Sequence, residues 1–136
     1  MSSQLNPYLS FNGNARKALE FYESVFGGHL NMTTFASFGR TGPDGERIMH
    51  GMLETRDGYT IMGADVTSDM RYEAPAGVSV ILSGEDSEIL RGYFAKLAAS
   101  GTTTMPLQKQ SWGDEFGMCV DGYGIPWMVN ISTGHA

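Results

Sequence analysis

Apolar residues recur every three or four positions in two segments of the chain, and this spacing predicts two amphipathic helices. The first covers residues 15–26, where the apolar stripe includes Leu19 and Tyr22. The second covers residues 87–99. Glycines follow both segments, as is typical of a helix C-terminus. Asn14 is the expected N-cap of the first helix, because a short polar side chain can accept a bond from the first turn.

Runs rich in β-branched and aromatic residues flank both predicted helices, and they predict strands separated by Gly-, Pro- and Asp-containing turns. One strand precedes each helix and three follow it. The expected strands of the first half are residues 6–11, 30–38, 49–55 and 59–64. The expected strands of the second half are residues 78–82, 102–108, 117–120 and 127–131. Pro106 interrupts the strand at 102–108, since proline cannot donate to a strand ladder.

The same order of elements therefore occurs twice, which predicts a duplicated unit. A shift of 71 residues lays Leu19 on Leu90 and Tyr22 on Tyr93, and it lays the segment Phe11-Asn12-Gly13 on Leu82-Ser83-Gly84. We expect one domain over residues 1–136, with the following parts: module one at 5–66, a linker at 67–76 and module two at 77–132.

This order predicts an α+β fold of two βαβββ modules. Each helix covers one face of its strands and leaves the other face bare. Two such modules can curl their bare faces into a cup-shaped mixed sheet. Concave, mostly apolar walls with a few polar groups are typical of small-molecule sites, so the cup is the expected place of function.

Composition and charge exclude several classes of partner. The 136 residues carry a formal net charge of −6 and no basic run, which argues against nucleic acid and against anionic membranes. No stretch reaches the roughly 20 apolar residues of a membrane helix. The first residues lack the charged and apolar regions of a signal peptide, so a cytoplasmic protein is expected. Cys119, in an apolar run, is expected to be a buried small hydrophobe rather than a catalytic thiol.

Four stretches resemble the PhnB-like branch of the vicinal oxygen chelate superfamily, which contains glyoxalase I, bleomycin-resistance proteins and extradiol dioxygenases. They are Asn6-Pro7-Tyr8-Leu9-Ser10-Phe11-Asn12-Gly13-Asn14-Ala15, Ala18-Leu19-Glu20-Phe21-Tyr22, Ile48-Met49-His50, and Trp112-Gly113-Asp114 through Trp127-Met128-Val129-Asn130. The resemblance implies paired βαβββ modules, a cup-shaped site and a homodimer. Many relatives carry the label demethylubiquinone methyltransferase. The chain has no Gly-rich strand-to-helix fingerprint for a methyl-donor cofactor, so we do not expect that activity.

The resemblance also implies where metal ligands stand in metal-using members, on the first and last strand of each module. Here those positions hold Asn6, Met62, Ser79 and Met128. Amide, hydroxyl and thioether groups bind hard or borderline divalent ions weakly, so no cofactor is expected. The alternative is a metal-dependent lyase, isomerase or dioxygenase whose divalent metal is held by His50 with Glu54 or Asp65.

His50 opens a predicted strand and shares a face with Met52 and Glu54 by alternation. Its possible roles are metal ligand, general base and hydrogen-bonded structural residue. His29 follows the glycines that end the first helix and is expected at the surface. His135 lies in the C-terminal tail.

The remaining candidates would line the cup with neutral polar groups and thioethers, a lining that suits an uncharged or weakly polar organic molecule. The candidate substrate-binding residues are Asn6, Tyr8, Ser10, Met62, Ser79, Trp112, Met128 and Asn130. The predicted function is a sequestering protein or a metal-independent enzyme with His50 as base. A second possibility is an interaction module without catalysis, in which methionines such as Met62 and Met128 only fill the core.

Overall fold

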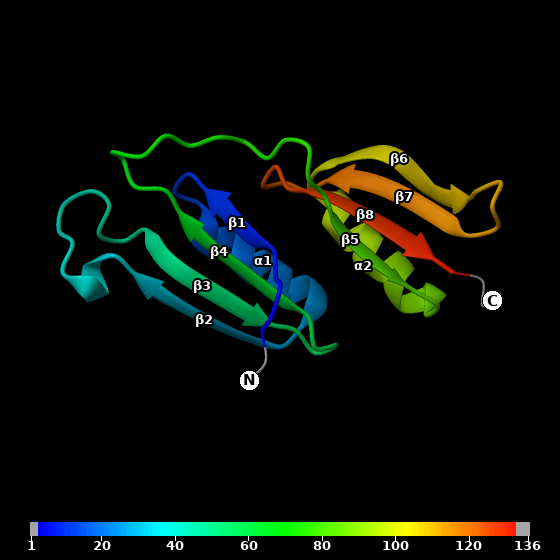
Figure 1. Cartoon of the computed structure of the whole chain (residues 1–136), viewed down its shortest axis with the longest axis horizontal. Coiled ribbons are helices and arrows are strands. Elements are labelled where there is room, and N and C mark those ends of the chain that lie inside the picture. Colours follow the sequence, from blue (N-terminus) through cyan, green and yellow to red (C-terminus); the bar gives the residue numbers. More distant parts are fainter. Residues whose placement is uncertain (1–2, 133–136) are drawn as a thin grey trace. The chain divides into compact units, whose positions relative to one another are not determined.

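The computed structural model describes residues 3–132, which separate into two compact units between Ala74 and Pro75. Each unit contains one long helix and a four-stranded sheet (Figure 1). This is the α+β glyoxalase/bleomycin resistance-like fold that the sequence predicts. His135 lies outside the described residues. Among residues 3–132 there is no helix with the length and apolar character needed to span a bilayer.

The first unit has a mixed sheet with the strand order β1-β4-β3-β2. Its elements are β1 (Tyr8–Phe11), α1 (Ala15–Phe26), β2 (His29–Thr34), the 3-10 helix η1 (Ala36–Phe38), β3 (Ile48–Glu54) and β4 (Thr60–Asp65). Strand β1 runs parallel to β4, and the other neighbours are antiparallel. The strand that follows α1 therefore ends at Thr34, four residues earlier than predicted, because the chain turns into η1.

The second unit repeats this arrangement with the strand order β5-β8-β7-β6. Its elements are β5 (Val80–Gly84), α2 (Ser87–Ala99), β6 (Thr102–Lys109), β7 (Glu115–Val120) and β8 (Pro126–Ile131). Strand β6 continues through Pro106 because its pairing with β7 shifts register between Thr103 and Met105 and again between Met105 and Gln108. Such irregular pairing accommodates a residue without an N–H.

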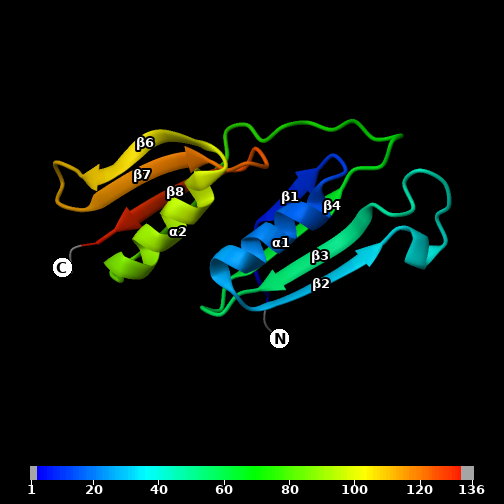
Figure 2. The same ribbon diagram turned by 180° about the vertical axis from the view of Figure 1, so that it is seen from behind.

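Each helix packs its apolar stripe on one face of its own sheet, as the view of α1 and α2 from behind shows (Figure 2). Leu19, Tyr22 and Phe26 are fully buried under α1. Gly51 of β3 makes the close approach possible, because a Cβ atom there would stand 2.4 Å from Leu19 Cδ1. The opposite face of each sheet, called the helix-free face below, is not covered by the helix of its own unit.

The strand pairing corrects the register of the internal repeat. Phe11 O accepts a bond from Val66 N at the end of β1, and Gly84 O accepts the corresponding bond from Ser132 N at the end of β5. The first strands therefore correspond with a shift of 73 residues, from Phe11 to Gly84, so Gly84 does not correspond to Gly13. The helices keep the predicted shift of 71. The step from the strand end to the buried leucine of the helix is thus two residues longer in the first unit, from Phe11 to Leu19, than in the second, from Gly84 to Leu90.

Candidate functional site

The helix-free face of the first sheet collects the candidates of the first module. Along β1, Tyr8 and Ser10 are exposed while Leu9 and Phe11 are buried against the helix. Along β4 and β3, half-buried side chains alternate with buried ones in the same way. The alternation predicted from the sequence for β1 and for His50, Met52 and Glu54 is therefore present, since successive side chains of a strand point to opposite faces.

Tyr8 and His50 meet on this face, although β4 lies between their strands. The Tyr8 hydroxyl oxygen lies 3.3 Å from His50 Nδ1, and the two rings are stacked with centroids 5.9 Å apart. Tyr8 is 52% exposed, so the pair is open to a ligand. Partial burial raises the pKa of Tyr8 above its usual value, so the phenol keeps its proton at neutral pH.

The contact between Tyr8 and His50 sets the chemistry of the imidazole. In one tautomer Nδ1–H donates to the phenol oxygen and leaves the Nε2 lone pair free as an acceptor or base. In the other tautomer the phenol donates to Nδ1, and Nε2–H is a donor. The pair can therefore accept or donate one hydrogen bond at Nε2 while Tyr8 holds the ring in place.

Met52 and Met62 lie beside this pair and form a methionine floor. Met62 pairs with Tyr8 on one side and with Met52 on the other. Asn6 Nδ2 lies 3.9 Å from Met62 Sδ and 3.2 Å from Gln4 Oε1, which places the Asn6 amide at the border of the floor. Thioethers are apolar and adapt their shape, so this floor suits an apolar part of a ligand.

The helix-free face of the second sheet carries the candidates of the second module. Ile81, Met128 and Met118 form one cross-strand row, and Ser83, Asn130 and Phe116 form the next. Asn130 Nδ2 donates to Asp114 Oδ2 over 3.1 Å. Ser79 is exposed just before β5. This face is neutral apart from Asp114 at its border.

Trp112 lies in the turn between β6 and β7 and is 57% exposed. Its ring meets the ring of Phe116 edge-on, with centroids 6.2 Å apart. The indole therefore extends the apolar surface of the second sheet beyond the strands, where a flat ligand can stack on it.

The structure places the residues of the alternative metal site apart from one another. His50 and Glu54 share a face of β3 but stand four residues apart, about 13 Å along a strand, too far for one ion. Asp65 points to the opposite, helix-covered face and is only 5% exposed. Within residues 3–132 no group of three or more His, Cys, Asp or Glu side chains is placed to hold a metal ion.

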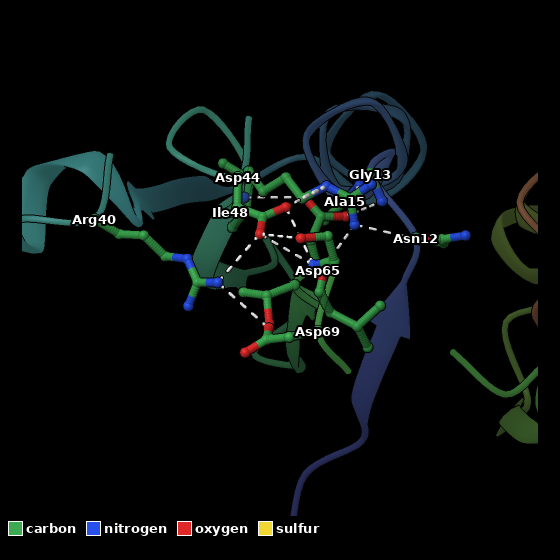
Figure 3. Close-up of polar contacts among 12 residues, drawn as sticks. Asn12, Gly13, Ala15, Arg40, Asp44, Ile48, Asp65 and Asp69 are labelled. Atoms are coloured by element: carbon green, nitrogen blue, oxygen red, sulfur yellow. Dashed lines mark hydrogen bonds and ion pairs between the residues drawn. The ribbon is translucent and has the colours of Figure 1, made fainter. Parts of the chain in front are cut away.

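Asp65 instead organises the turn between β1 and α1 (Figure 3). Its Oδ1 accepts bonds from Gly13 N at 2.8 Å and Ala15 N at 3.0 Å, and its Oδ2 accepts one from Ile48 N at 2.9 Å. Asn14, the predicted N-cap, makes no side-chain capping bond. A carboxylate from β4 thus satisfies the helix N-terminus in its place.

A second buried carboxylate, Asp44, ties the loop after η1 to the segment after β4 (Figure 3). It accepts from Ser68 N and from the Ser68 hydroxyl at 2.7 Å, and Arg40 lies 3.2 Å from its Oδ2. These bonds, with Ser68 first and then Arg40 and Arg47, hold the pKa of Asp44 below its usual value. Sequence reasoning missed both carboxylates, since an Asp in a loop or at a strand end looks solvated until its partners are known.

The groups that the fold family implies do not fit the residues present. Asn6, Met62, Ser79 and Met128, at the superfamily's metal positions, offer an amide, a hydroxyl and two thioethers, which are poor donors for a hard divalent ion. At the turn where a strand–helix cofactor site would begin, the Asp65 carboxylate already occupies the backbone N–H groups of Gly13 and Ala15. We therefore derive no step through a divalent metal or a methyl donor.

The geometry of both sheets agrees with comparisons to known proteins. A family model described as 3-demethylubiquinone-9 3-methyltransferase matches residues 3–130. The chain belongs to this family. It is 34% identical to the protein PA1353 from Pseudomonas aeruginosa, whose crystal structure superposes with a TM-score of 0.87, covering 96% of this chain and 98% of that one.

Two further structures are similar to this chain. A PhnB protein from Bacillus cereus is 25% identical, with a TM-score of 0.76 over 96% of this chain and 100% of that chain. A glyoxylase/bleomycin resistance protein/dioxygenase domain from Frankia sp. EAN1pec is 17% identical, with a TM-score of 0.66 over 99% and 96% of the two chains, which shows a shared fold. The chain is thus a PhnB-like protein with the vicinal oxygen chelate fold.

Proposed function

We propose that this PhnB-like protein binds a small, uncharged or weakly polar organic molecule on the helix-free face of its first sheet. The observation that carries the proposal is the contact of Tyr8 with His50 beside the floor of Met52 and Met62. A ligand would exchange a hydrogen bond with His50 Nε2 and lay an apolar part on the thioethers. The face has few charged groups, which supports a neutral ligand.

The same arrangement supports two uses of the site. As a sequestering protein, the chain needs only the hydrogen bond and the apolar floor. As a metal-independent enzyme, it would use His50 as a general base, with Nδ1–H donating to the Tyr8 oxygen so that Nε2 takes a proton from the ligand. The second use requires an acidic proton within hydrogen-bond reach of Nε2. Tyr8 would then be a positioning residue for the base.

The proposal extends to the helix-free face of the second sheet. Its neutral lining by Met128, Asn130, Ser79 and Trp112 supports a ligand of the same character. A cytoplasmic homodimer belongs to the proposal as well, supported by the resemblance to the PhnB-like branch. Light scattering tests the dimer, and a monomeric mass would contradict it.

The experiment is a thermal-shift screen of metabolites and aromatic antibiotics, followed by calorimetric titration of each hit. A molecule that binds only the folded state raises the melting temperature as it saturates the site. We expect Tyr8→Phe and His50→Ala to weaken binding by roughly tenfold or more, as the loss of one hydrogen bond in the complex predicts. His29→Ala is the matched control, because His29 is an exposed histidine on the neighbouring strand β2.

Three outcomes would contradict the proposal. One is a hit whose affinity is equal in His50→Ala and in the parent protein. Another is equal weakening by His29→Ala, which would indicate a nonspecific effect of lost charge. The third is the absence of any hit over a broad screen, which would favour the interaction module.

A further inference from the structure

Three methionines stand side by side on the helix-free face of the second sheet. Met128 of β8 pairs with Met118 of β7, and Met118 pairs with Met105 of β6. Met118 is therefore the centre of a row that crosses three strands. Met118 and Met128 are half-buried, and Met105 is 37% exposed, so solvent reaches the row from one end.

The spacing of this row lets the three sulfurs converge. Cβ atoms of directly paired residues lie about 4.5–5.5 Å apart, as expected for Met128 beside Met118, and Met105 stands opposite Met118 between two register shifts of β6. Each sulfur sits on a flexible, unbranched arm with three rotatable bonds. One ion above Met118 is thus within reach of all three thioethers without a change in the backbone.

The chemistry of the row selects the kind of ion. Thioether sulfur is a soft, neutral ligand, which favours Cu(I) and related soft ions over Mg²⁺, Ca²⁺ or Mn²⁺. The neighbouring row contains Ser83, Asn130 and Phe116, and offers no carboxylate to hold a hard cation. Glu115 is bound by Arg91 of α2, whose Nε donates to Glu115 Oε1 over 3.1 Å.

We propose that Met105, Met118 and Met128 form a binding site for a soft monovalent cation, Cu(I) or Ag(I), coordinated by three thioether sulfurs. This site goes beyond the organic ligand proposed above, since it needs neither Tyr8 nor His50. Met128 stands at a position where metal-using relatives place other ligands. A thioether at this position selects a soft ion in place of a hard one.

The first sheet supplies an internal comparison. Its corresponding row is Tyr8, Met62, Met52 and Asn31, which contains only two methionines, with an amide in the third position. Two thioethers hold a monovalent ion less firmly than three. Substitutions in the first row should therefore leave the binding of the ion at the second row unchanged.

Cys119, the single cysteine of the sequence, could imitate the site, because a thiolate binds the same soft ions. It follows Met118 in β7 but points to the helix-covered face and is 1% exposed. Burial, with Asp121 nearby, raises the pKa of its thiol to about 11. The test is therefore made in a Cys119→Ala background, with binding in the parent protein measured alongside.

The experiment titrates Ag(I), which is not oxidised in air, into protein with ¹³C-labelled methionine methyl groups. The chain has nine methionines, and leucine variants assign their methyl signals. We expect a stoichiometric complex that shifts the signals of Met105, Met118 and Met128 and leaves that of the exposed loop residue Met70 in place. Met118→Leu should abolish the complex, whereas Met52→Leu should not change it.

The proposal fails if Met118→Leu binds Ag(I) as its parent does, if removing Cys119 alone removes the complex, or if the shifted signals are those of Met52 and Met62. Leucine is close to methionine in volume, so the fold should persist. Should Met118→Leu unfold, Met105→Leu at the solvent end of the row provides the same test. A negative result with Ag(I) has no bearing on the organic-ligand screen, because that screen contains no soft ion.

Discussion

The two helix-free faces correspond position by position but differ in the groups that can form hydrogen bonds. Strand pairing aligns Tyr8 of the first unit with Ile81 of the second, since each pairs with the central methionine of its last strand. His50, two residues before Met52, corresponds to Phe116, two residues before Met118. Ile81 and Phe116 of the second unit thus stand where the first unit has the phenol of Tyr8 and the imidazole of His50.

The shared positions show which side chains can differ between the two units without a change of fold. Met62 matches Met128, and Met52 matches Met118. The helix-covered faces must fill a core, so their side chains are constrained by packing. The helix-free faces carry no such demand, and the polar pair occurs on only one of them. The phenol and imidazole on which the proposed proton transfer depends thus occur in the first unit, whereas the second unit has Ile81 and Phe116 at these positions.

The turns of the two units differ as well. The first unit satisfies the start of its helix with the buried Asp65, whereas the second uses the local N-cap Asp86, which accepts from Ile89 N over 3.3 Å. The second unit places its buried carboxylate, Asp121, in the hairpin between β7 and β8.

The largest effect is expected from Asp65→Ala. Three backbone N–H groups, two of them buried, lose their acceptor, and a lost network of this kind costs about 3–5 kcal/mol in the free energy of unfolding. Asp86→Ala is the matched control and should cost about 1 kcal/mol, as for an ordinary cap. Urea denaturation measures both. Equal losses would mean that the two turns depend on their carboxylates to the same extent.

The next effect is expected from Asp121→Ala. Asp121 accepts bonds from Tyr123 N, Ile125 N and the indole N–H of Trp127, the last over 2.8 Å. We expect a loss of about 2–3 kcal/mol in the free energy of unfolding. The corresponding hairpin of the first unit has Thr55, whose hydroxyl accepts only from Tyr59 N, so Thr55→Val should cost about 1 kcal/mol. The reverse order of the two losses would contradict this account.

Cys119 makes the stability of the second unit depend on pH. Its thiol pKa is raised from 9.0 to about 11, so the folded state holds the proton more tightly than the unfolded state. The resulting stabilisation is complete below pH 9 and is lost as the pH rises through 11, by about 2 kcal/mol. Urea midpoints at several pH values should fall less steeply for Cys119→Ala than for the parent. Parallel slopes would show that the thiol does not contribute.

The smallest effect on stability is expected from His50→Phe, which makes the first face resemble the second. The side chain is half-buried, so the free energy of unfolding should change by less than about 1 kcal/mol. Binding of an organic ligand at the first face should nevertheless be lost. The reciprocal Phe116→His should not create binding, because Ile81 offers no hydroxyl to orient the ring. Calorimetry of both variants checks this, and gained affinity in Phe116→His would contradict it.

Much of the fold could be predicted from the sequence, because the spacing of apolar residues reflects directly which side chains pack in the core. Both helices begin and end where their apolar stripes predict. The strand after α1 was overextended because Phe35 and Phe38 continue an apolar pattern into η1. Asn14 stands at the place that predicts an N-cap, but the acceptor of the Ala15 N–H is Asp65, 50 residues after Ala15.

The candidate site could be predicted in part. Alternation placed Tyr8 and His50 on strand faces correctly, but their contact depends on the order β1-β4-β3, which no local pattern reports. The face of β4 on which Asp65 lies, relative to His50 on β3, likewise follows only from the strand pairing. The role of the methionines, and the cup of the two modules, stay predictions.

The two-residue difference in offset between strand and helix stripe determines how the halves of this chain can be recombined. A chimera with its crossover point inside the strand–helix connection would join a strand with one offset to a helix with the other. The apolar stripe would then be rotated about its axis, and Leu19 or Leu90 would leave the sheet. Only exchanges that carry strand, connection and helix as one block should yield folded hybrids.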